Sequence, residues 1–267
     1  MLIESTVHLP ISLSMLDGLF KAPDSAEIAR VTLRWLHFLG GITWIGLLYF
    51  FNLVNVPLQK KLDPDTKKKV NPDLLLPALW FFRWGALVTV LAGLTYFAMY
   101  ILGPDVNNAN TIGGGHVNVW VVLLSWLSYP VVLFIVEMLI IKKVPALTKD
   151  GRVFAVVMLI LIGIVTYGLL MFLSAKLTIG GYVPSNKTYS IGVGGAYGIL
   201  MLLNVWGIIW PNNKRMIGAL QGGPPAAPEL ARQAFLASRT NAWLSLPMLL
   251  FMATSHGDWL IFSGKNG

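Results

Sequence analysis

Histidine is the residue type in this chain best suited to chemistry inside apolar helices. The chain has four histidines, and two of them, His37 and His256, lie within apolar stretches at 31–54 and 241–262. Each lies equally far from the predicted outer end of its stretch, at a depth of about 9 Å if the stretch is helical. Two imidazoles at one depth on different helices suit the two axial positions of a b-type haem. The alternative for each is a hydrogen bond to a neighbouring helix.

The residues around His37 support the same hypothesis. Gly40 and Gly41 follow it by about one helical turn and would let a flat porphyrin approach the backbone. Arg34 precedes it by about one turn and can pair with a haem propionate, or else extend towards the membrane interface as a snorkelling side chain. His116 is a third candidate, because the glycine run before it can place it over an outer-facing pocket.

Composition shows which elements must position these residues. Hydrophobic residues make up 55% of the chain and charged residues 12%, whereas soluble domains contain about 25% charged residues. Apolar stretches long enough to cross about 30 Å of hydrocarbon recur along the chain, and in lipid they must be helical to satisfy their backbone groups. We therefore predict an all-α integral membrane protein of about six transmembrane helices. The stretches are 31–54, 78–102, 117–141, 153–174, 189–210 and 241–262.

The basic residues predict how this bundle is oriented. Lys and Arg concentrate in the first, third and fifth connections, and the second connection has none. The positive-inside rule then places those three connections in the cytoplasm and both termini outside. The net charge of +8 thus reflects topology and does not indicate a nucleic-acid partner. We expect an outer N-terminal segment at 1–30, which can be interfacial, a membrane domain at 31–262 and a short outer tail at 263–267.

Other polar residues in the helices have structural interpretations. Arg83 and Glu137 lie near predicted cytoplasmic ends, where both can snorkel or form an ion pair. Asn52, Asn55 and Asn204 are expected to make hydrogen bonds between helices. The chain has no cysteine, which excludes disulfides, iron–sulfur clusters and a covalently attached c-type haem. A non-covalent haem held by histidine is compatible with this composition.

Four stretches resemble a known family. They are RWLHFLGGITWIG at 34–46, GAYG at 195–198, NVWGIIWP at 204–211, and SRTNAWLSLPM at 238–248 continuing to Ser255 and His256. They are similar to the membrane domain of bacterial urate oxidases that are fused to a cytochrome c. The first stretch also resembles the haem-b protoporphyrinogen oxidases of bacteria. The likeness covers most of the first, fifth and sixth apolar stretches, and the others match in hydropathy alone.

The resemblance implies a redox module in the bacterial cytoplasmic (inner) membrane that passes electrons to a cytochrome c outside it. It also implies that His37 and His256 hold the haem. Because this chain has no cysteine, its cytochrome c partner would be a separate protein, or it would be a subunit of a larger redox complex. An oxidase acting on a small molecule such as urate, and a haem-free structural or assembly subunit, are the alternatives. Any enzymatic activity would be that of an oxidoreductase.

Overall fold

The computed structural model describes residues 23–256 and 261–262. The described residues form helices joined by short connections, with one isolated bridge between Ile179 and Tyr182, which confirms the predicted all-α class. Most of the predicted outer N-terminal segment and the whole outer tail fall outside the described residues. The elements are α2 (Ser25–Tyr49), η1 (Phe50–Asn55), α3 (Val56–Lys61), α4 (Pro64–Phe97), η2 (Ala98–Leu102), α5 (Gly103–Thr111), α6 (Val119–Lys143), α7 (Pro145–Thr148), α8 (Gly151–Leu177), α9 (Asn186–Asn204), η3 (Val205–Ile209), α10 (Trp210–Leu220) and α11 (Glu229–Ala253).

Among the described residues, five helical segments are long and apolar enough to cross a membrane. Each overlaps one of the first five predicted stretches. Several of these segments are longer than the predicted stretches, because the backbone stays helical through polar residues on either side of the apolar part. The segments are Ser25–Lys61, Pro64–Thr111, Val119–Lys143, Gly151–Leu177 and Asn186–Leu220.

The sixth predicted stretch, 241–262, is displaced in the structure. The corresponding helix, α11, runs from Glu229 to Ala253. At its end the hydroxyls of Thr254 and Ser255 donate to the backbone carbonyls of Leu250 and Met252, at 2.8 and 2.7 Å. These bonds compete with continuation of the helix. His256 therefore lies beyond the helix and not within it as predicted.

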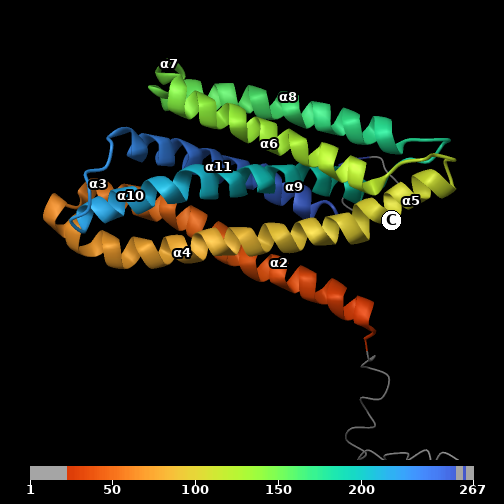
Figure 1. Cartoon of the computed structure of the whole chain (residues 1–267), viewed down its shortest axis with the longest axis horizontal. Coiled ribbons are helices and arrows are strands. Elements are labelled where there is room, and N and C mark those ends of the chain that lie inside the picture. Colours follow the sequence, from red (N-terminus) through yellow and green to blue (C-terminus); the bar gives the residue numbers. More distant parts are fainter. Residues whose placement is uncertain (1–22, 257–260, 263–267) are drawn as a thin grey trace, which may run out of the picture.

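The long helices run side by side along the long axis of the molecule (Figure 1). Figure 1 shows α6 and α8 on one side, α9 and α11 in the middle, and α2 and α4 on the other side, and the contacts between these pairs agree. The first turns of α2 project away from the middle helices. A capping box starts α2, since Asp24 accepts from the Glu27 amide at 2.8 Å and Glu27 accepts from the Asp24 amide at 3.2 Å. The spacing of Asp24 and Glu27 is typical of this kind of helix start.

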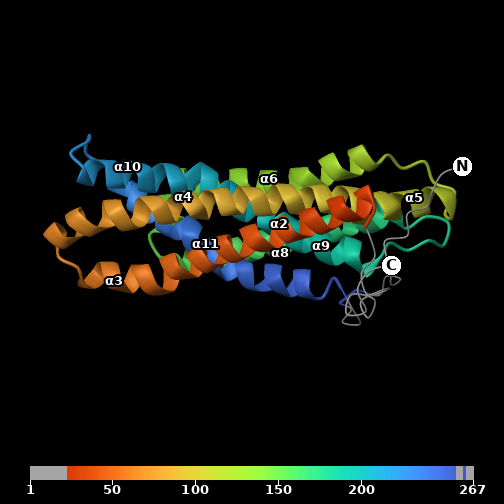
Figure 2. The same cartoon turned by 90° about the horizontal axis from the view of Figure 1, so that it is seen from below.

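The two ends of the bundle differ in construction. One end holds α3, α10 and the start of α4, and the other holds α5 and the connection from α8 to α9 (Figure 2). At the α5 end, buried Asp105 accepts hydrogen bonds from the Tyr182 hydroxyl, the Ser185 amide and the Ser185 hydroxyl, at 2.7, 2.8 and 2.9 Å. Burial and the bond to Asp105 raise the pKa of Tyr182 to about 12. Asp105 thus ties α5 to the α8–α9 connection.

Candidate functional site

His37 is held in a defined orientation on α2. Its side chain is partly buried, and its Nδ1 lies 2.8 Å from the backbone carbonyl oxygen of Thr89 on α4. A carbonyl oxygen can only accept, so the geometry assigns the proton to Nδ1. The lone pair of a neutral His37 is then on Nε2. Protein ligands to metals commonly have this arrangement, in which one ring nitrogen is fixed by a backbone carbonyl and the other is free to coordinate.

Gly93 of α4 makes room for the His37 ring. A Cβ atom added at Gly93 would lie 2.6 Å from His37 Nδ1 and 2.7 Å from His37 Cε1. No side chain larger than hydrogen fits there unless the imidazole moves. Gly93 and Thr89 contact His37 in the candidate site and were not identified from the sequence. The available signal was the stripe of small residues at helical spacing formed by Gly85, Thr89 and Gly93.

Gly40 and Gly41 face the neighbouring helix α4. A Cβ atom at Gly40 would lie 2.7 Å from Thr89 Oγ1 and 3.0 Å from the Gly85 carbonyl oxygen. At Gly41 the nearest such atom is Thr89 Cγ2, at 3.7 Å. Gly40 therefore allows α2 and α4 to cross closely, which sets the height of His37 relative to Thr89. This packing role differs from the predicted contact with a porphyrin.

Arg34 lies one turn before His37 and is exposed. Its guanidinium group lies 5.9 Å from the centre of the Tyr96 ring. An aromatic ring at this distance can hold a guanidinium group through a cation–π contact. The positive charge of Arg34 is thereby kept beside the His37 turn.

His256 lies in the turn after α11 and is exposed. Its Nδ1 lies 2.7 Å from the hydroxyl oxygen of Ser255, which is buried. Partial burial lowers the pKa of His256, and the positive charges of Arg34 and Lys187 lower it further.

His116 lies elsewhere, in the exposed connection between α5 and α6. Asn110 holds this connection by donating to the Val117 carbonyl at 2.9 Å and accepting from the Val117 amide at 2.7 Å. Gly113 packs against the backbone of Ile179 in the α8–α9 connection. None of these contacts brings His116 to the His37 turn of α2.

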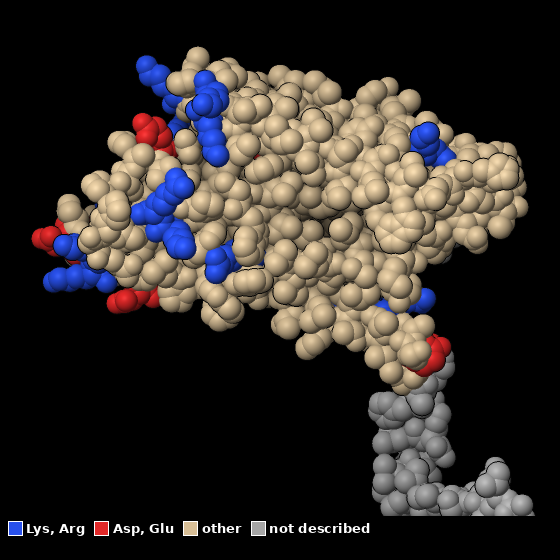
Figure 3. All heavy atoms as spheres, in the orientation of Figure 1, with Lys and Arg blue, Asp and Glu red and all other residues tan. Residues whose placement is uncertain are grey.

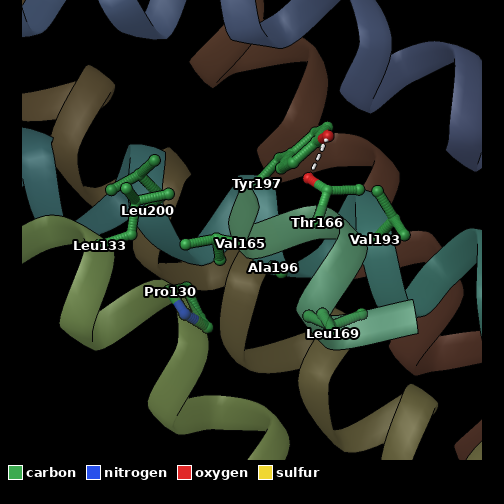
Figure 4. A pocket seen from close by; sticks show the side chains of 9 residues that line it. All are labelled: Pro130, Leu133, Val165, Thr166, Leu169, Val193, Ala196, Tyr197 and Leu200. Atoms are coloured by element: carbon green, nitrogen blue, oxygen red, sulfur yellow. Dashed lines mark hydrogen bonds between the residues drawn. The ribbon is translucent and has the colours of Figure 1, made fainter. Parts of the chain in front are cut away.

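An apolar cavity of about 10 Å³ lies between α6, α8 and α9. At one edge the hydroxyls of Thr166 and Tyr197 are 2.8 Å apart (Figure 4). This volume accommodates about one water molecule and is far too small for a porphyrin. Its lining residues are Pro130, Leu133, Val165, Thr166, Leu169, Val193, Ala196, Tyr197 and Leu200.

Comparison with known proteins assigns the chain to a family. Residues 64–266 match the family described as urate oxidase N-terminal. The chain belongs to this family. The membership confirms the resemblance found in the apolar stretches. No curated protein and no solved structure shows detectable similarity to the chain.

The family match covers only some of the candidate residues. It includes Thr89, Gly93 and His256 but begins at residue 64, after α2. Arg34 and His37 therefore lie outside the matched part, and their assignment to the site comes from the geometry described above. In this family member, α4 is the matched helix that receives the His37 ring.

The structure also corrects the interpretation of Arg83 and Glu137. Glu137 is fully buried and does not snorkel. Its Oε2 accepts from Asn204 at 2.9 Å, while the Arg83 guanidinium lies 3.8 Å from the centre of the Trp210 ring. The described residues contain no ion pair between Arg83 and Glu137. Asn204 does join helices, as expected for polar residues inside a bundle.

Asn52 makes the second such contact. Its amide group donates to the backbone carbonyl of Leu48 at 3.0 Å and to the Ser238 hydroxyl of α11 at 2.9 Å. Asn55 accepts from Gln59 at 3.1 Å within one helical turn. The bond from Asn52 joins η1 to α11, so that residue does link helices, whereas the bond of Asn55 is local.

Proposed function

We propose that this member of the urate oxidase N-terminal family is a membrane-embedded electron-transfer protein that holds a b-type haem. The observation that carries the proposal is the geometry of His37. Its Nδ1 is engaged by Thr89, its ring occupies the space left by Gly93, and its Nε2 is left to coordinate. These residues fit an axial haem ligand, because a fixed tautomer presents the coordinating nitrogen without further rearrangement.

His256 and Arg34 supply the other two contacts in this proposal. His256 would be the second axial ligand, since its Nδ1 is engaged by Ser255 and the Nε2 of a neutral imidazole can coordinate. Arg34 would pair with a haem propionate, because a guanidinium group matches a carboxylate bidentately. The bound haem would supply reversible one-electron transfer. Thr89 and Gly93 of α4 would hold the His37 ring in the orientation in which its Nε2 could bind the group.

The distribution of charge supports the orientation within the membrane. Figure 3 shows that Lys and Arg gather mainly at the end of the bundle opposite α5. That end would face the cytoplasm of a bacterial cell by the positive-inside rule, and the histidine-bearing end would face outwards. α11 would form the sixth span, with both termini outside. A separate cytochrome c, or a subunit of a larger redox complex, would exchange electrons on the outer side.

The test is the visible spectrum of the full chain after expression with added haem. We expect a reduced α band typical of b-type haem, lost in His37→Ala and weakened or lost in His256→Ala. His116→Ala is the matched control, since His116 lies in a separate exposed connection. A correctly inserted protein without haem would refute the proposal and favour the structural-subunit alternative. Reduction of the bound haem by urate would instead identify a small-molecule oxidase.

A further inference from the structure

A polar network crosses the middle of the bundle, away from the histidines. Glu137 of α6 has no exposed surface, and its Oε2 accepts from Asn204 Nδ2 of α9 at 2.9 Å. The same Asn204 amide donates to Asn241 Oδ1 of α11 at 3.0 Å, and Asn241 donates to the Met201 carbonyl at 2.9 Å. Three helices therefore meet through one buried carboxyl group and two amides.

This network has fewer hydrogen-bond donors than its buried oxygens need. Among the described residues, Glu137 Oε1 and Asn204 Oδ1 are buried oxygens without a hydrogen-bond partner. Thr240 of α11, which precedes Asn241, makes no hydrogen bond to Oε1. An unpartnered buried acceptor destabilises the fold, and an unpaired charge in apolar surroundings destabilises it much more. The network lacks a donor on the carboxyl side.

The basic groups of the surrounding helices have other partners or lie far along their helices. Arg83 of α4 lies over the Trp210 ring. Arg232 of α11 donates to the Thr148 carbonyl at 2.7 Å, and Arg239 lies 5.3 Å from the Phe235 ring centre. The ends of the other packed elements carry Lys142, Lys143, Lys149, Arg152, Lys176 and Lys187. The described residues include no ion pair to Glu137, so no cation neutralises it.

The network also coincides with departures from α-helical geometry. The π-helical segment η3 begins at Val205, directly after Asn204. A second π-helical segment, η1, contains Asn52, which bonds Ser238 of α11 at 2.9 Å, about one turn before Asn241. Short π-helical segments occur frequently at functional sites. The chain thus changes from α-helical to π-helical geometry at or next to Asn52 and Asn204, the two residues whose side-chain amides donate to α11.

We propose that Glu137 is a proton-binding site inside the bundle. A proton taken from water forms an O–H bond at Oε1, which removes the charge and supplies the missing donor. Asn204 Oδ1 is the other buried oxygen of the network that lacks a donor. Glu137 lies about 9 Å along α6 from Lys143 at the basic end, at helical rise. The network thereby serves as an internal acid.

Infrared spectroscopy of the full-length protein tests the proposal directly. We expect a carbonyl stretch of a protonated carboxylic acid at neutral pH, which shifts in heavy water and disappears in Glu137→Gln. Glutamine keeps the size and neutrality of the protonated side chain, so the variant should insert and fold. Glu229→Gln is the matched control, because Glu229 is exposed at the start of α11, and it should leave the band in place.

A second measurement covers the case in which Glu137→Gln does not fold. Wild-type protein labelled with carbon-13 at the glutamate carboxyl should show the same band displaced to lower frequency. Absence of a protonated-acid band from the wild type at neutral pH would overturn the proposal. Its disappearance on adding sodium or potassium ions at constant pH would also overturn it, because the network would then be a cation site. Neither result depends on haem, so the redox proposal is tested separately.

Discussion

A methyl group added at Gly93 should displace the His37 ring and weaken the packing of α2 against α4. In Gly93→Ala the new Cβ would lie 2.6 Å from His37 Nδ1 and 2.7 Å from Cε1, well inside van der Waals contact. The α4 backbone is held by its own helix, so the imidazole must move. The 2.8 Å bond from Nδ1 to the Thr89 carbonyl is then stretched or broken, and the preferred tautomer is no longer fixed.

The expected loss can be estimated from these contacts. Overpacking at a filled position costs about 1–3 kcal/mol, and losing one hydrogen bond adds about 0.5–1.5 kcal/mol. We expect Gly93→Ala to lower the free energy of unfolding by on the order of 2 kcal/mol. If His37 ligates haem, disturbing its backbone partner should reduce haem affinity by about 10- to 100-fold.

The assay combines thermal denaturation in detergent with titration of haem into the apoprotein. Gly46→Ala is the control, because a Cβ at Gly46 meets no atom within 4 Å and should leave both measurements near the wild-type values. The informative variant is the double substitution Gly93→Ala with His37→Ala. Removing the ring makes space for the methyl group, so the alanine at 93 should then cost almost nothing.

The double-mutant cycle also measures the energetic coupling between Gly93 and His37. Residues in contact are expected to show interaction energies of about 0.5–3 kcal/mol. If the costs of Gly93→Ala and His37→Ala simply add, the His37 ring does not occupy the space at Gly93. Wild-type stability and haem affinity in Gly93→Ala alone would refute the described geometry of the site.

Two other predictions concern the carboxylates at the ends of α4 and α5. Asp105→Ala should lower the unfolding free energy by on the order of 3 kcal/mol, because Tyr182 and two further donors lose their acceptor; denaturation of exposed Asp73→Ala should match the wild type. The hydroxyl and amide of Thr66 hold the pKa of Asp63 below its ordinary value. Stabilisation of the α4 start is therefore present above the ordinary carboxyl pKa and lost as pH falls through the lowered one. Amide-exchange protection there should decline in acid, and an Asp63→Asn variant that declines equally would contradict this explanation.

Elements with strong local signals were predictable. The spacing of Asp24 and Glu27 is typical of a capping box, and the box forms at the start of α2. The apolar stretches predicted helices because lipid leaves the backbone no other way to satisfy its polar groups. The predicted end of α11 was wrong, because the helix ends at Ala253, where polar Thr254 and Ser255 bond back to its carbonyls, while the apolar composition continues.

The amino-acid sequence by itself determined the all-helical class and the apolar, membrane-like character of five helices, since both follow from composition and from spacing along one chain. It also indicated His37 and His256, because an imidazole within or beside an apolar stretch is unusual wherever it packs. Only the tertiary structure decided which contacts those residues make. Gly93 matters because α4 crosses α2 at that height, and the two unpartnered oxygens beside Glu137 exist because three helices meet there. Such relations depend on the rotation and separation of helices, which hydropathy and periodicity do not encode.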